Sequence, residues 1–132
     1  MNTLKAFMAG IVVPNLLLPI ALFTAWKFGA EQLFRMGFLH FVPLIWGIWN
    51  VLYFALFKRI CRADKSRRLW TVGGLLGLLT AIYGVFWLHI PSIIGLPESL
   101  TYLPLIAVPL IYGFLWRFIV KALNDLLGLQ DD

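Results

Sequence analysis

Charged residues are scarce in this chain of 132 residues, of which they make up only 13%. A soluble domain usually has about 25%. Four long windows, 6–26, 36–57, 69–97 and 99–116, contain no Asp, Glu, Lys or Arg. Hydrophobic residues make up 61% of the chain, and a soluble fold of this length cannot bury so much apolar surface. The shortage of charge therefore excludes an ordinary soluble domain.

Reactive and metal-ligating side chains are also few. Cys61 is the only cysteine, which excludes a disulfide within the chain, and no Cys/His spacing matches a zinc site. Proton-coupled pumps and ion-driven exporters usually need an ionisable group inside the membrane, and the four windows offer none. The sequence has no plausible nucleophile–base arrangement and no phosphate-binding glycine loop. We therefore expect no enzymatic activity and no cofactor.

Long apolar segments make up most of what remains. A helix of about 20 residues crosses the hydrocarbon core of a membrane, where the backbone must satisfy its own hydrogen bonds. The windows are continuous rather than alternating, which favours helices over a barrel. The predicted fold is an all-α integral membrane protein with one domain, residues 1–132. Its four transmembrane helices, at about 6–26, 37–57, 69–89 and 99–127, form a bundle.

The distribution of Lys and Arg predicts the orientation of these helices. Nine of the 11 basic residues lie between the second and third helices or near the chain ends, and only Lys27 and Arg35 lie in the other loops. Because the basic side is usually cytoplasmic, both termini are expected in the cytoplasm, as in a multi-pass protein of a bacterial inner membrane. Segment 58–68 should contact anionic lipid or a partner protein rather than nucleic acid. Its basic residues are Lys58, Arg59, Arg62, Lys65, Arg67 and Arg68.

The end of the fourth helix carries a polar stripe. Arg117, Lys121, Asn124 and Asp125 share one face at helical spacing, and the opposite face is apolar. This pattern is typical of an amphipathic helix that lies on a membrane surface or docks on a partner. We therefore expect a short amphipathic extension after Trp116.

Prolines interrupt three of the predicted helices. A proline inside a helix has no N–H to donate, so it frees the carbonyl four residues earlier and bends the helix. We expect kinks in the first helix at Pro14 and Pro19, in the second at Pro43 and in the fourth at Pro109.

Three neutral polar side chains are predicted near the middle of the bundle. Asn15 and Asn50 lie at similar depths when counted from the inner helix ends, and Thr80 lies near the same level. One interpretation is interhelical hydrogen bonding, worth about 0.6–2 kcal/mol per bond. The other is a polar substrate site at the membrane midplane. The sequence leaves both open.

A stripe of small residues follows one side of the third helix. Its members are Gly73, Gly77, Ala81 and Gly84, at the spacing that lets another helix approach closely. The approaching helix can belong to this chain or to a second protein.

The only histidines, His40 and His89, are predicted near the outer ends of the second and third helices. Two imidazoles at one level suit a metal ion or haem. Imidazoles at a polar interface also occur without any ligand.

Three functional hypotheses follow, in order of preference. The first is a non-enzymatic accessory or assembly subunit of an inner-membrane complex, which contacts its partner through the stripe of small residues. The second is a small homo-oligomeric transporter or channel for a neutral or lipid-like substrate, with Asn15, Asn50 and Thr80 lining its passage. The third is a membrane protein that binds metal or haem through its two histidines.

Overall fold

The computed structural model describes residues 2–129, and within that range it is helical with no strand. The α-helices are α1 (Thr3–Lys27), α2 (Gly37–His40), α3 (Val42–Leu52), α4 (Lys58–Ile60), α5 (Lys65–Ile82), α6 (Ile90–Ile93), α7 (Pro104–Leu115) and α8 (Lys121–Leu126). Three π-helical turns, Tyr53–Phe57, Tyr83–Trp87 and Trp116–Val120, continue α3, α5 and α7. Two short 3₁₀ helices, Glu31–Arg35 and Glu98–Leu100, lie in the loops.

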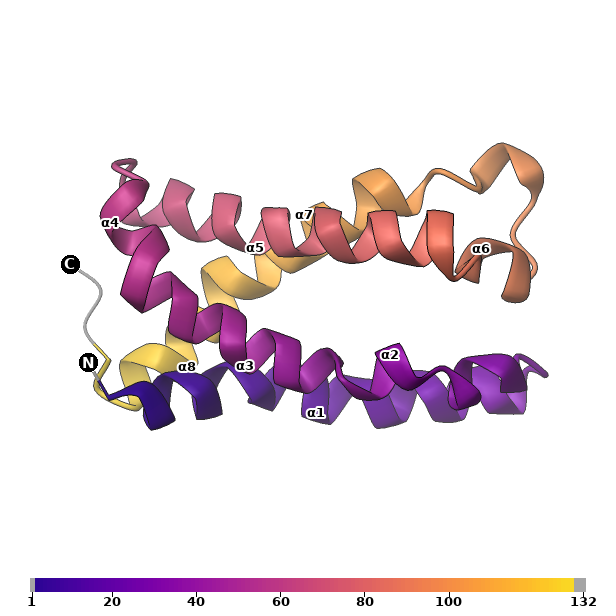
Figure 1. Ribbon diagram of the computed structural model, residues 1–132, viewed down its shortest axis with the longest axis horizontal. Coiled ribbons are helices and arrows are strands. Elements are labelled where there is room, and N and C mark those ends of the chain that lie inside the picture. The colour runs from indigo at the N-terminus through magenta and orange to yellow at the C-terminus, as the bar shows by residue number, and fades with distance from the viewer. Residues whose placement is uncertain (1, 130–132) are drawn as a thin grey trace.

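The long helices form two antiparallel hairpins. α1 packs along α3, and α5 packs along α7. Figure 1 shows α7 and its continuation α8 running diagonally, so that α8 reaches the first hairpin beside α1. The start of α1 and the end of α8 lie at the same end of the molecule as α4 (Figure 1). The diagonal rod is therefore the element that ties the two hairpins together.

Glycines allow the first hairpin to close. A Cβ atom on Gly10 would lie 2.6 Å from the Trp46 carbonyl oxygen, and one on Gly47 would lie 2.6 Å from the Phe7 ring. Such distances are too short for any side chain, so the two backbones meet at these positions. Close approach of this kind maximises the dispersion contacts that hold helices together in lipid.

Three helices are long and apolar enough to cross a membrane: Thr3–Lys27, Lys65–Trp87 and Pro104–Leu126. Thr3–Lys27 and Lys65–Trp87 correspond to the predicted helices at about 6–26 and 69–89. The second of these begins four residues earlier than predicted, at Lys65, where the Asp64 side chain caps the first turn by accepting a hydrogen bond from Arg67 N. The last one begins at Pro104 rather than near residue 99.

The segment predicted as the second span is divided. α2 ends at His40, and α3 starts at Val42 with Pro43 in its first turn. A proline in the first turn of a helix loses no intrahelical hydrogen bond. The expected kink at Pro43 is therefore wrong: this proline begins a helix, whereas Pro14, Pro19 and Pro109 lie inside α1 and α7.

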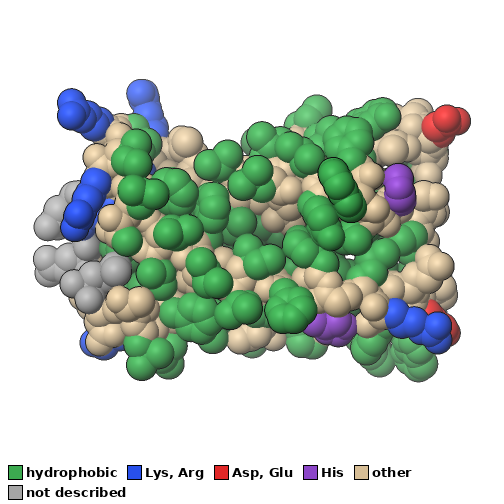
Figure 2. Space-filling view, in the orientation of Figure 1, with side chains coloured by type: hydrophobic (Ala, Val, Ile, Leu, Met, Phe, Trp, Pro, Cys, Tyr) green, Lys and Arg blue, Asp and Glu red, His purple; other side chains and the backbone are tan. Residues whose placement is uncertain are grey.

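Apolar side chains cover the outside of the bundle, and several polar ones point inward. Leu16 and Ile20 are 65% and 64% exposed, whereas Asn50 and Asn124 are buried. Figure 2 shows hydrophobic side chains over the middle of the molecule, with most of the visible Lys and Arg at the end that carries α4 and fewer at the opposite end. This inside-out distribution is the one that hydrocarbon surroundings favour, so the structure is consistent with a membrane protein.

The expected amphipathic extension after Trp116 is present as α8, but it is not a separate helix on the surface. α8 follows α7 directly through the π turn at Trp116–Val120. Asn124, on its polar stripe, is only 3% exposed and points into the bundle, while Leu126 is 80% exposed. The extension is therefore the last part of a long helix, whose Asn124 faces the first hairpin while Arg117 and Asp125 contact α5.

Candidate functional site

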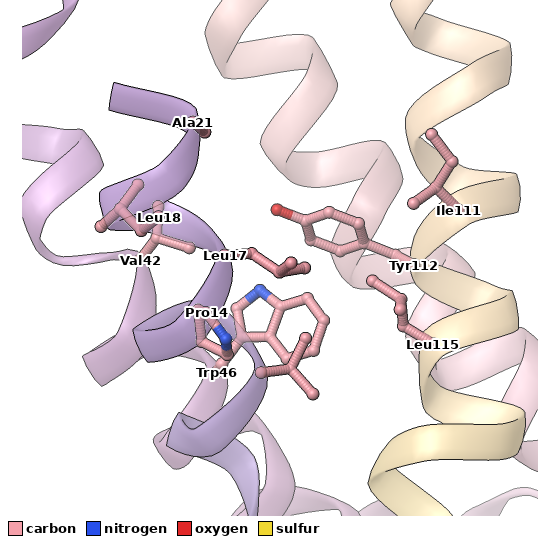
Figure 3. A pocket seen from close by; sticks show the side chains of 10 residues that line it. Pro14, Leu17, Leu18, Ala21, Val42, Trp46, Ile111, Tyr112 and Leu115 are labelled. Atoms are coloured by element: carbon pink, nitrogen blue, oxygen red, sulfur yellow. The ribbon is translucent and has the colours of Figure 1, made fainter. Parts of the chain in front are cut away.

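An apolar cavity lies between the two hairpins, where α1, α3 and α7 meet. Its volume is about 210 Å³, and no charged side chain lines it. Figure 2 shows the molecule hollowed between the hairpins toward the end opposite the termini. The lining residues, seen in Figure 3, are Val13, Pro14, Leu17, Leu18, Ala21, Val42, Trp46, Ile111, Tyr112 and Leu115.

Two polar atoms interrupt this apolar lining. The Trp46 side chain is 3% exposed, and among residues 2–129 its indole N–H has no hydrogen-bond partner in good geometry. The Tyr112 hydroxyl faces the side chains of Trp46 and Thr80 and interacts with both, but no hydrogen bond of ordinary geometry joins it to the indole N–H. Both polar atoms are on the cavity side in Figure 3. An unpaired buried donor costs free energy unless a ligand supplies an acceptor.

Packing holds these two aromatic side chains in place. The Trp46 ring lies edge-on to Tyr112 with centroids 4.9 Å apart, and it also contacts Trp116 at 5.9 Å. Close approach of α5 and α7 fixes Tyr112 from the other side, because a Cβ atom on Gly77 would lie 2.9 Å from its Cβ. The donors are therefore preorganised by the contacts between helices.

A second cavity, of about 310 Å³, lies on the other side of Tyr112, among α5, α6 and α7. Its lining is apolar except for Thr80 and the Tyr112 hydroxyl, and the Thr80 hydroxyl donates to the Leu76 carbonyl oxygen over 2.8 Å. Because Tyr112 lines both cavities, its side chain forms the partition between them. Two of the small residues of the third helix, Ala81 and Gly84, line this second cavity.

The structure does not bring Asn15, Asn50 and Thr80 together. Asn50 is fully buried, and its side-chain nitrogen donates to the Ala6 carbonyl oxygen over 2.7 Å and to Asn124 Oδ1 over 2.8 Å. The Asn124 nitrogen donates back to Asn50 Oδ1 over 3.3 Å. Asn15 is exposed on the outer surface of α1. Asn50 and Asn124 thus form a buried polar pair that joins α3 to α8.

The stripe of small residues packs against the helix next to it in the same chain. A Cβ atom on Gly73 would lie 2.5 Å from Trp116 Cβ, and one on Gly77 would lie 2.8 Å from the Pro109 Cα. Gly84 faces Ile90, at 3.4 Å from its terminal methyl group. The face of α5 that carries the stripe is therefore covered by α7 and α6.

The predicted basic segment divides into exposed and buried members. Arg59, Arg62 and Arg67 are exposed, and Lys58 and Lys65 are half-buried. Arg68 is buried, and its Nε donates to the Tyr53 hydroxyl over 3.2 Å. Arg68 thus packs between helices while its exposed neighbours face the surroundings. Around the same end, Lys65 and Lys121 pair with Asp125, at 3.9 and 2.7 Å, and Arg117 donates to Ser66 over 2.6 Å.

The two histidines have different surroundings. His40 Nε2 is 2.8 Å from the Phe34 carbonyl oxygen, a backbone contact within the same loop region. His89 is exposed and has a positive φ of 52°, and it is the residue that precedes α6, two positions after the helix that includes α5 ends at Trp87. Within residues 2–129 no group of three or more His, Cys, Asp or Glu side chains is placed to hold a metal ion.

Sequence reasoning missed Trp46, Tyr112 and Asn124 as members of buried polar sites. The only available signal was their polar atoms within or beside apolar windows. Comparisons with protein-family models, with curated proteins and with solved structures found no match for this chain. The function must therefore be inferred from the geometry described above.

Proposed function

We propose that this chain binds one neutral, lipid-like molecule inside a membrane, between its two helical hairpins. The observation that carries the proposal is the unpaired indole N–H of Trp46, buried at the wall of an otherwise apolar cavity. Cavities that bind small molecules are mostly apolar with a few placed polar groups. This is the class of substrate expected for a small transporter or carrier.

The lining defines the chemistry of the ligand. No charged side chain borders either cavity, so a charged group would be desolvated without compensation. Trp46 offers only a donor, and a tyrosine hydroxyl can both donate and accept. The ligand should therefore carry an acceptor oxygen, such as a carbonyl or ester, attached to an apolar chain or ring system that fills the remaining space.

The site lies in a chain that we propose crosses the membrane four times. Residues 42–60 are continuously helical through α3, a π turn and α4, which gives about 28 Å at 1.5 Å per residue. Together with the three long helices they account for four crossings. The basic end then faces the cytoplasm of a bacterial-type inner membrane, with both termini there. Its exposed arginines would contact anionic lipid headgroups.

The accessory-subunit hypothesis loses the surface on which it depended. Gly73 and Gly77 would have contacted a partner protein, but both face α7 of the same chain. A partner would have to use another part of the apolar surface. Ligand binding, in contrast, would give the indole N–H of Trp46 a partner; the other unpaired buried indole N–H among residues 2–129, that of Trp116, lines neither cavity.

Identification of the neutral lipids that copurify with the protein tests the proposal. The full-length chain is purified in mild detergent, and its bound neutral lipids are identified by mass spectrometry. Leu115→Trp should abolish the enriched species by filling the cavity, which Leu115 lines from a half-buried position, while Leu110→Trp should retain it because Leu110 does not line the cavity and is 61% exposed. Equal recovery from the two variants, or no enriched species in the wild type, would refute the proposal.

A further inference from the structure

Asn15 is an unpaired amide at the centre of a membrane-crossing helix. It lies midway between Thr3 and Lys27, the two ends of α1, and about 18 Å from each. The side chain is exposed, and it makes no hydrogen bond with any described residue. The Asn15 carbonyl also lacks its usual helical donor, because Pro19 has no N–H.

Hydrocarbon cannot satisfy either group. Acyl chains offer no donor or acceptor, and unpaired polar groups at this depth are costly. Asn15 borders an apolar groove between α1 and α8, about 420 Å³ in volume, whose wall includes Met8, Val12 and Leu123. This face of α1 is separate from the cavity between the hairpins. The exposed amide therefore requires an occupant that can form hydrogen bonds at mid-membrane depth.

We propose that the occupant is a second copy of this chain, with Asn15 of each protomer bonded to Asn15 of the other. A carboxamide carries both donors and acceptors, so it is complementary to itself. Copies inserted in the same orientation hold Asn15 at the same depth, so lateral approach about a two-fold axis along the membrane normal brings the pair together. A two-fold interface uses the same patch on both protomers, and this patch is apolar around a single amide.

Cysteine cross-linking in native membranes tests the geometry. In a Cys61→Ser background, Asn15→Cys should give a disulfide-linked dimer on mild oxidation. Leu79→Cys is the matched control, because Leu79 is exposed and lies close to the middle of the membrane-length helix Lys65–Trp87, on the other hairpin. Cross-linking at Asn15 but not at Leu79 supports the interface. No cross-link at Asn15, or equal cross-linking at both positions, overturns it.

Substitution of the amide tests the chemistry. In detergent titrations followed by fluorescence energy transfer, Asn15→Leu should weaken self-association about 5- to 30-fold, the equivalent of losing two interhelical hydrogen bonds. Asn15→Gln keeps the amide and should retain most of the affinity. Since Asn15 has no side-chain hydrogen bond to any of residues 2–129, both variants should fold. If Asn15→Leu associates as strongly as the wild type, or if no dimer forms in any of the three, the proposal is wrong.

Discussion

Asn124→Leu should strongly lower the free energy of unfolding, although it replaces a polar side chain in an apolar protein. The substitution removes both hydrogen bonds between Asn124 and Asn50 and leaves the Asn50 oxygen buried without a donor. Interhelical hydrogen bonds in membranes average about 0.6 kcal/mol and reach about 1.7. With the penalty for the unpaired oxygen, we expect a loss of about 2–4 kcal/mol.

A double-mutant cycle isolates the contribution of the pair. Unfolding is followed in mixed micelles under dilute conditions, in which the chain is monomeric, for Asn50→Leu, Asn124→Leu and the double variant. The coupling energy should be about 1–2 kcal/mol, because the second substitution removes little once the first has been made. Asn15→Leu is the control and should leave stability within about 0.5 kcal/mol, since the Asn15 side chain forms no hydrogen bond with the part of the protomer that the structure describes. A coupling energy near zero would refute the pairing.

Two further comparisons use the same unfolding assay, one between Gly77 and Gly74 and the other between Arg68 and Arg67. Gly77→Ala should destabilise the protein by about 1–3 kcal/mol, because the new methyl group would lie 2.8 Å from the Pro109 backbone. Gly74→Ala should be neutral or slightly stabilising, since its nearest contact would be an ordinary 3.6 Å. Equal effects would mean that α5 and α7 do not meet at these glycines. Arg68→Leu should cost about 1–3 kcal/mol through loss of its buried hydrogen bonds, whereas exposed Arg67→Leu should change stability by less than about 1 kcal/mol. The reverse order would contradict the buried position of Arg68.

The long helices were predictable because lipid-compatible segments are recognisable by length and absence of charge alone. Three of the four predicted windows contain helices long enough to cross a membrane. The division of the second window at Phe41 had a signal in the sequence, namely Pro43, because a proline often lies in the first turn of a helix. Pro43 was interpreted as a kink because the window continued on both sides of it.

The polar contacts were less predictable because they depend on how the helices cross. Asn50 and Asn124 are 74 positions apart, and they meet only because α8 continues diagonally to the first hairpin. The π turn before α8 adds a residue to one helical turn, so the direction of later side chains departs from ideal helical spacing. The position of the Trp46 indole N–H was unpredictable for the same reason, because the Trp46 ring packs against Tyr112, which comes from the other hairpin.

Native mass spectrometry of the protein released from lipid nanodiscs tests the central claim most directly. The wild type should retain one neutral, lipid-like molecule per chain after bulk lipids have been removed. Trp46→Phe, which keeps an aromatic ring but loses the N–H together with part of the indole volume, should bind the same molecule at least about fivefold more weakly, the change expected for one hydrogen bond. A wild type that carries only a non-specific ladder of membrane lipids, identical in Trp46→Phe, would contradict a binding site between the hairpins.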